Sequence, residues 1–193
     1  MPEMDDCCVD DRHLRWTFLL DNPLRRLLTR PKKFVSQYVS RGDTVADLGC
    51  ASGFFAIPMA EVVGPEGKVY AIDSDEKSIK KLNSKSSRLG HQNIHARVES
   101  AAQLDSIGDH SLDFVFANLV LCCMVDHAGA VSEIKRTLKS DGSAYMSVAR
   151  LQNWRKDPKH VVREEWRSIL EGFQITKERT SLTARWAVVT LRA

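Results

Sequence analysis

The feature that most constrains the fold of this 193-residue chain is a regular alternation of strand-like and helix-like segments from Asp43 onward. Short apolar runs at 44–48, 68–72, 93–98, 112–117 and 143–148 alternate with segments of helical spacing at 53–63, 75–88 and 128–138. Such alternation indicates a parallel sheet with helices on both faces and right-handed crossovers.

The C-terminal part of the chain departs from this pattern. A helix predicted over 159–170 is followed by two expected strands, 173–177 and 185–191. The segment between these strands is too short for a helical crossover, so they must pair as an antiparallel hairpin. We therefore predict an α/β fold: a doubly wound, mostly parallel seven-stranded sheet with an antiparallel C-terminal edge hairpin.

The chain is long enough for one domain with a proper core and too short for two comfortable ones. Five acids crowd the first eleven residues, which predicts a solvated arm. Residues 12–40 show helical spacing interrupted near Pro23 and Pro31. We expect 1–40 to be an acidic arm and helices that cover the site, and 41–193 to be a single globular domain.

Composition excludes several classes of protein. The net charge of +3 is too small to indicate a nucleic-acid partner, and no apolar run reaches the ~18 residues of a membrane span. The acidic N-terminus does not resemble a signal peptide. Five cysteines, four of them in the adjacent pairs Cys7-Cys8 and Cys122-Cys123, do not form a disulfide framework. We expect a cytoplasmic protein with reduced thiols; its oligomeric state stays open.

The loop after the first strand, in the stretch VADLGCASGFF (45–55), predicts a ligand site, because ligands of doubly wound sheets bind outside the carboxyl ends of the strands. It lacks the spacing of a phosphate-binding P-loop. A dinucleotide fingerprint starting at Gly49 would need glycines where the chain has Ala51 and Phe54. The loop therefore fits an NAD-dependent oxidoreductase poorly. This class of enzyme stays an alternative because the chain has a strand, a glycine loop and Asp73 in the order that such enzymes have.

Two acids favour another ligand. Asp47 lies one residue before the end of the first strand, where a carboxylate would repel a pyrophosphate but would suit an ammonium and a sulfonium centre. Asp73 ends the second strand, where an acid accepts hydrogen bonds from a ribose diol. A ribose diol with positive charge and no phosphate describes S-adenosylmethionine.

The segments 45–53, 69–73, 112–118 and 138–142 resemble, in order and spacing, the motifs of class I S-adenosylmethionine-dependent methyltransferases. The chain is most similar to the small-molecule branch that includes the ubiquinone and menaquinone biosynthesis methylases, over roughly residues 20–193. The resemblance implies a Rossmann-like methyltransferase fold and in-line methyl transfer to a small-molecule acceptor.

The resemblance also implies roles for individual residues. Asp47 would orient the methionine ammonium, and Asp73 would hold the ribose hydroxyls. Backbone groups of the glycine loop would contact the methionine part, and the other cofactor residues would lie near the adenine or the sulfonium. The loop residues are Gly49, Cys50, Ala51 and Gly53; the adenine residues are Ser74, Glu99, Ser100 and Ala101; Asn118 faces the sulfonium. After the third strand the family usually has an acid, which here is either replaced by Ser100 or supplied by Glu99 in a shifted register.

The catalytic residues are unknown, with Cys122, Cys123 and His127 as candidates. One hypothesis is that Cys7, Cys8, Cys122 and Cys123 meet at the site and bind a thiophilic metalloid such as arsenite, or a soft metal. The other is that Cys122 and Cys123 pack as small apolar residues. His127 is either a general base or a residue at the start of a helix.

The acceptor stays open among a thiophilic species, a quinone-like compound and a carboxylate. Ala51, Ser100 and the lack of an evident base also keep open a non-catalytic, cofactor-binding protein of methyltransferase type.

Overall fold

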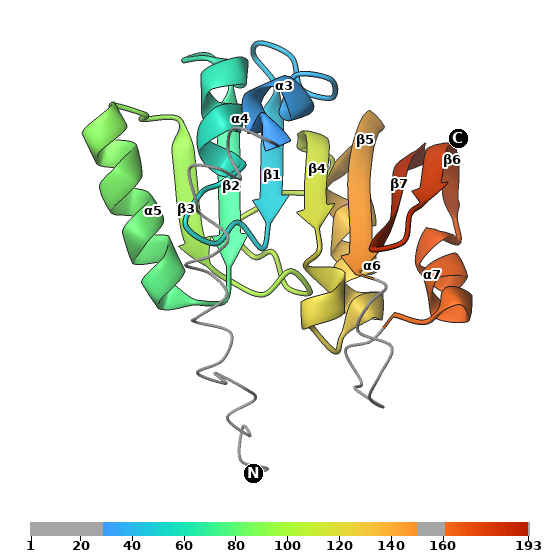
Figure 1. Ribbon diagram of the computed structural model, residues 1–193. Coiled ribbons are helices and arrows are strands. Elements are labelled where there is room, and N and C mark those ends of the chain that lie inside the picture. The colour runs from blue at the N-terminus through green and yellow to red at the C-terminus, as the bar shows by residue number, and fades with distance from the viewer. Residues whose placement is uncertain (1–28, 150–160, 193) are drawn as a thin grey trace.

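The computed structural model describes residues 29–149 and 161–192. Within them, a seven-stranded sheet has the order β3-β2-β1-β4-β5-β7-β6 (Figure 1). The strands are β1 (Thr44–Leu48), β2 (Lys68–Asp73), β3 (Ile94–Val98), β4 (Leu112–Asn118), β5 (Leu138–Ala149), β6 (Phe173–Thr180) and β7 (Ala184–Leu191). β1 to β5 pair in parallel, and β7 pairs antiparallel with both β5 and β6. The predicted doubly wound sheet with a reversed edge hairpin is confirmed.

Helices cover both faces of the sheet and divide the core in two. On one face lie α3 (Pro31–Val35), α4 (Ala56–Val63) and α5 (Glu76–Leu89), whose apolar side chains pack with alternate strand residues. The other face carries the 3-10 turn η1 (Leu121–Cys123), α6 (His127–Thr137) and α7 (Arg163–Leu170). A sheet buried on both faces explains why its strands are nearly continuous apolar runs.

Both ends of α5 are set by local interactions. The side chain of Asp75 accepts hydrogen bonds from the backbone N–H groups of Lys77 and Ser78, at 3.1 Å each, and is the N-cap. Gly90 follows the helix in the left-handed conformation, with φ of 76°.

Several predicted boundaries are wrong. α7 begins at Arg163 instead of residue 159, and β6 continues to Thr180 instead of ending at residue 177. α4 begins at Ala56 instead of residue 53, because Gly53 has a φ of 86° and belongs to the preceding turn. β5 begins at Leu138, directly after α6, instead of at residue 143. Leu138 is already extended and pairs with Leu112 of β4, and the strand continues past a register shift through Asp141 and Gly142.

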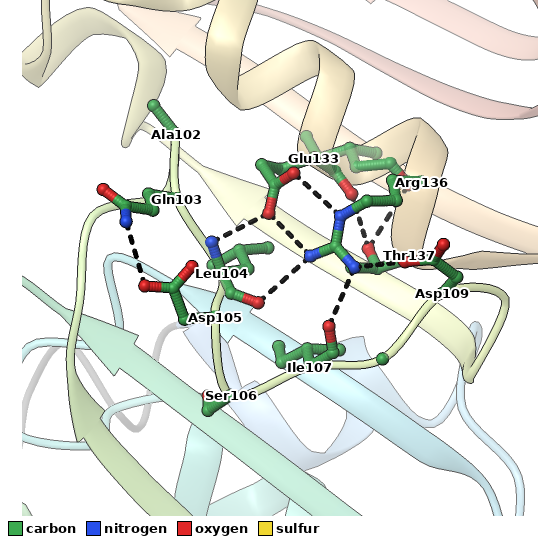
Figure 2. Close-up of polar contacts among 12 residues, drawn as sticks. Ala102, Gln103, Leu104, Asp105, Ser106, Ile107, Asp109, Glu133, Arg136 and Thr137 are labelled. Carbon is green, nitrogen blue, oxygen red and sulfur yellow. Dashed lines mark hydrogen bonds and ion pairs between the residues drawn. The ribbon is translucent and has the colours of Figure 1, made fainter.

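A polar cluster, here called the Arg136 clamp, joins the loop between β3 and β4 to α6 (Figure 2). Arg136 donates from Nε and Nη2 to both carboxylate oxygens of Glu133, at 2.8 and 2.7 Å. The same guanidinium donates to the carbonyl oxygens of Leu104 and Ile107, and to Asp109. Glu133 in turn accepts from the backbone N–H of Leu104 at 2.8 Å. This network holds the loop that follows the end of β3.

Candidate active site

The predicted site residues of the glycine loop lie at the carboxyl edge of the sheet, between the ends of β1 and β2 (Figure 1). The backbone N–H groups of Gly49 and Cys50 both donate to the carbonyl of Ile72, at 2.8 and 3.0 Å. Gly53 N–H donates to Cys50 at 3.0 Å and closes the turn. The loop is therefore held against β2 before any ligand binds.

Two glycines are required by close approach as well as by backbone conformation. A Cβ on Gly49, whose φ is 73°, would lie 2.9 Å from the side chain of Val120 in the loop after β4. A Cβ on Gly53 would lie 2.4 Å from Leu82 of α5. The glycines thus allow the loop to pack closely against the segment after β4 on one side and against α5 on the other.

Asp47 is buried beneath this loop, and only part of the hydrogen-bonding capacity of its carboxyl group is used. It is 3% exposed, and its Oδ2 has no hydrogen-bond partner among the described residues. Burial raises the pKa of Asp47 to about 8; the negative charge of Asp73 acts in the same direction, and a hydrogen bond with the backbone of Ala56 opposes it. Within residues 29–149 and 161–192, no cation is paired with this carboxyl, although buried charges are normally paired.

Asp73, at the end of β2, organises the loop from the other side. One carboxylate oxygen accepts from the backbone N–H of Ala51 at 2.8 Å, and the other from that of Asp75 at 2.9 Å. Burial raises the pKa of Asp73, and these two hydrogen bonds oppose the effect. Ala51 has a left-handed φ of 46°, the conformation for which a glycine is the usual residue.

The residues predicted to line the adenine side differ in burial and in hydrogen-bond partners. Ser74 is exposed, and Ala101 is buried in the core. The Glu99 carboxylate accepts a hydrogen bond from the Ser106 hydroxyl at 3.0 Å. Ser100 Oγ accepts from the backbone N–H of Ala102 at 3.1 Å and so shapes its own turn.

Asn118 ends β4, on the strand next to β1. Its Oδ1 accepts a hydrogen bond from the buried Ser147 hydroxyl at 2.8 Å, and that hydroxyl accepts from the backbone N–H of Leu119 at 3.0 Å. Leu119 has a φ of 61°. The chain therefore turns sharply as it leaves β4 and brings η1 over the carboxyl edge.

Known proteins share this arrangement of strands and loops. A family model described as "Methyltransferase domain" matches residues 39–184. The chain belongs to the methyltransferase-domain family. A demethylmenaquinone methyltransferase from Geobacillus kaustophilus is 30% identical over 131 residues, which cover 68% of this chain and 50% of the relative. An arsenite methyltransferase from Halobacterium salinarum is 27% identical over 61% of this chain and 29% of its own length.

A solved structure supports the same fold. The crystal structure of a SAM-dependent methyltransferase from Aquifex aeolicus has a TM-score of 0.76 and 24% identity, and the match covers 90% of this chain and 95% of that one. The predicted resemblance to class I S-adenosylmethionine-dependent methyltransferases is confirmed, and S-adenosylmethionine is the cofactor of this family. The chain spans about half the length of the demethylmenaquinone methyltransferases that it matches.

The methyltransferase domain presents two thiols directly after β4. The Sγ atoms of Cys122 and Cys123 both lie 3.3 Å from the carbonyl oxygen of Leu119. Cys122 is buried and Cys123 is exposed. A hydrogen bond with the Cys123 thiol lowers the pKa of Cys122 to about 7, and contacts with backbone N–H groups and the charge of His127 act in the same direction. Cys50 is different, because burial raises the pKa of its thiol well above the ordinary value.

His127 begins α6 and is 6% exposed. Its Nδ1 lies 2.6 Å from Oε1 of Glu165 on α7, whereas its buried Nε2 has no partner among the described residues. The sequence offered no signal for Glu165, because 38 positions separate the two residues. The tertiary fold therefore adds a carboxylate–imidazole pair that pattern analysis missed.

The predicted thiol partners Cys7 and Cys8 lie outside the described residues. In the part of the chain that the structure describes, no group of three or more His, Cys, Asp or Glu side chains is arranged to hold a metal ion. Within the same ranges, no helix combines the length and apolarity needed to cross a bilayer.

Proposed function

We propose that this chain transfers the methyl group of S-adenosylmethionine to a small-molecule acceptor. The observation that carries the proposal is the buried, unpaired Oδ2 of Asp47 beside the glycine loop. A buried carboxyl oxygen kept without a partner in a folded protein is costly, and a cationic ligand would remove that cost. The ammonium of the cofactor's methionine part supplies such a cation.

Each predicted cofactor residue has a place in this proposal. Asp47 orients the ammonium, and the loop residues Gly49, Cys50, Ala51 and Gly53 contact the methionine part through their backbone. Asp73 uses the free lone pairs of its two oxygens for the ribose hydroxyls. Ser74, Glu99, Ser100 and Ala101 line the adenine side, and Asn118 faces the sulfonium.

When bound, S-adenosylmethionine supplies an electrophilic methyl group on a sulfonium that leaves as a neutral thioether. The chain's own contribution is then to align the acceptor with that methyl group and to exclude water. Alignment can supply on the order of 7–11 kcal/mol of a barrier. Charged catalytic machinery is not required unless the acceptor must lose a proton.

Calorimetric titration with S-adenosylmethionine and S-adenosylhomocysteine tests the proposal. We expect wild type to bind both, and Asp73→Ala to lose at least about tenfold in affinity because the ribose contacts are removed. Asp105→Ala, which changes an exposed carboxylate of the loop between β3 and β4, is the matched control. Absence of binding by the wild type would overturn the proposal. Binding without turnover in an acceptor screen would favour the non-catalytic alternative.

A second candidate concerns the acceptor: a thiophilic metalloid such as arsenite. Two neighbouring thiols that share one carbonyl contact, one of them with a pKa of about 7, favour it. Soft thiolates bind soft ions, and the arsenite methyltransferase relative is consistent with this class of acceptor. The role of Cys7 and Cys8 in such a site stays part of the proposal.

The thiol candidate requires that Cys122→Ser and Cys123→Ser each abolish arsenite-dependent formation of S-adenosylhomocysteine. Cofactor affinity should stay within about threefold of wild type, since neither side chain is assigned to the cofactor. Asp105→Ala, which changes an exposed side chain away from both thiols, serves as the control. Turnover of a quinone-like acceptor by both variants, with no arsenite turnover by the wild type, would reject the metalloid and keep the methyltransferase.

A further inference from the structure

The corner of the molecule formed by α7 and the β6–β7 hairpin, here called the C-terminal corner, gathers unpaired arginines. An open hollow of about 1310 Å³ lies there, far along the sheet from the glycine loop. Five arginines line it: Arg163, Arg167, Arg179, Arg185 and Arg192. Among the described residues none of the five forms an ion pair, although such pairs occur elsewhere on the surface.

The acids of this corner compensate the arginines only in part. Glu178 lines the hollow but accepts a hydrogen bond from the indole N–H of Trp166 at 3.0 Å. Glu165 is engaged by His127. Glu164 and Glu171 remain at the hollow. Over the described residues 161–192 there are six Lys and Arg against four Asp and Glu, so this part has a net positive charge.

Exposed aliphatic side chains stand among these arginines. Leu182, at the tip of the β6–β7 hairpin, is 88% exposed, and Val162 and Ile175 are about half exposed. The tip is well ordered by hydrogen bonds, because Ser181 Oγ accepts from the backbone N–H groups of Thr183 and Ala184. The turn therefore keeps the Leu182 side chain exposed to solvent, between the two strands that carry Arg179 and Arg185.

The hairpin tip and the start of α7 lie at the same edge of the sheet as the candidate active site, whereas Ile175 and Arg192 lie toward the opposite edge. Ala184, which begins β7, pairs with Ala149 at the carboxyl end of β5 (Figure 1). Val162 and Arg163 begin α7, whose first turn lies at the same edge (Figure 1). A flat partner that docks here would face the edge where β1, β2 and β4 end.

We propose that the C-terminal corner docks on the surface of an anionic lipid bilayer. Guanidinium groups without carboxylate partners match lipid phosphates, which they can bind with two parallel hydrogen bonds. Exposed Leu182 at the hairpin tip and Val162 at the start of α7 match the boundary between headgroups and acyl chains. A nucleic acid fits less well, since proteins that bind single strands use aromatic platforms, and every large apolar side chain exposed in the described ranges is aliphatic.

Vesicle co-sedimentation of the full chain, without cofactor or acceptor, tests this inference separately from methyl transfer. We expect binding to vesicles of phosphatidylglycerol and phosphatidylcholine in equal parts, weakening with salt, and at least about tenfold weaker binding to phosphatidylcholine alone. Arg163→Gln and Arg185→Gln should each weaken binding about fivefold. Leu182→Ser should weaken it about tenfold.

Matched controls lie at other places on the molecule. Leu89, 54% exposed at the end of α5, allows the control Leu89→Ser, and Lys80 on the same helix allows Lys80→Gln. Both should bind like the wild type. The inference is overturned by equal binding to neutral and anionic vesicles, or by controls that lose as much affinity as the corner variants. Salt-sensitive binding of a single-stranded RNA in place of vesicles, lost in Arg163→Gln, would overturn it in favour of a nucleic-acid surface.

Discussion

The Arg136 clamp and the glycine loop each contain a carboxyl group, but the two groups differ in their hydrogen bonding and in the direction of their pKa shift. In the clamp, Glu133 receives two hydrogen bonds from Arg136 and one from a backbone N–H, and the contact with Arg136 lowers its pKa. In the loop, Asp47 has an oxygen without a partner, and burial raises its pKa to about 8. The clamp lies at the far end of the loop that follows β3, whereas Asp47 lies beside the loop that follows β1.

The difference separates structural polar groups from functional ones. A network that only holds a fold can satisfy all its members, because nothing else has to bind to them. A carboxyl group that must bind a cationic ligand has to keep an oxygen free, and the fold tolerates the cost. Stability and ligand binding should therefore respond to different substitutions.

The largest expected effect is on cofactor binding by Asp47→Asn. The substitution keeps the shape of the side chain but removes its ability to ionise when the cation binds, so we expect affinity for S-adenosylmethionine to fall at least about 100-fold, or roughly 3 kcal/mol. Titration calorimetry measures it. Glu133→Gln should bind the cofactor like the wild type, and equal losses in the two variants would erase the distinction between the regions.

The next largest effect is on the free energy of unfolding. Here we expect a substitution in the clamp to have the larger effect and a substitution of Asp47 the smaller one. Arg136→Met leaves the carbonyl oxygens of Leu104 and Ile107 and the Glu133 carboxylate without their donor, so we expect a loss of about 2–4 kcal/mol in the free energy of unfolding. Urea unfolding measures it. Asp47→Asn, which removes an uncompensated buried carboxyl group, should unfold at the same urea concentration as the wild type or a higher one.

The dependence on pH should differ in sign. The folded pKa of Asp47, about 8, exceeds its ordinary value of about 4, so its contribution to stability is complete below pH 4 and is lost as pH rises to 8. The folded pKa of Glu133 is lowered, so its contribution is present above its ordinary pKa and is lost as pH falls through the folded value. Urea unfolding of wild type, Asp47→Asn and Glu133→Gln at several pH values measures both. If the difference between Asp47→Asn and the wild type does not change between pH 4 and 8, the assignment is wrong.

The same pKa predicts a proton release on binding. At pH 7 the buried Asp47 is largely protonated, and a cationic ligand requires its ionised form. Calorimetry in two buffers of different ionisation enthalpy should show close to one proton released by the wild type and none by Asp47→Asn. An equal heat in both buffers for the wild type would contradict the ionised complex.

The smallest effect is expected at Ala51. Its φ of 46° is left-handed, which costs an alanine roughly 1–2 kcal/mol, whereas the greater freedom of an unfolded glycine costs about 0.5–1 kcal/mol. Ala51→Gly should therefore change stability by less than about 1.5 kcal/mol, in the stabilising direction. Thermal unfolding measures the change. Gly53→Ala should instead destabilise the same turn, because the new Cβ would clash with Leu82 and the residue would have to adopt a φ of 86°.

Much of the fold could be predicted because the signals are local. The strands around Val45 and Val69 are apolar runs between turn residues, and Asp75 and Gly90 mark the ends of α5 by their own chemistry. The boundary between α6 and β5 could not be predicted, because Leu138 extends only to pair with Leu112, a contact that the local sequence does not encode. Tertiary pairing overrides local propensity there.

By itself, the sequence determined the class of the protein: the alternation of elements, the glycine loop, and the acids at 47 and 73 are all encoded within short segments. Tertiary structure alone decided which polar groups are satisfied. Asp47 keeps a free oxygen, Glu133 finds Arg136, and His127 meets Glu165 from a distant helix. The physical reason is that burial and hydrogen-bond partners depend on contacts between segments far apart in the chain, and these contacts set the charge and chemistry of each group.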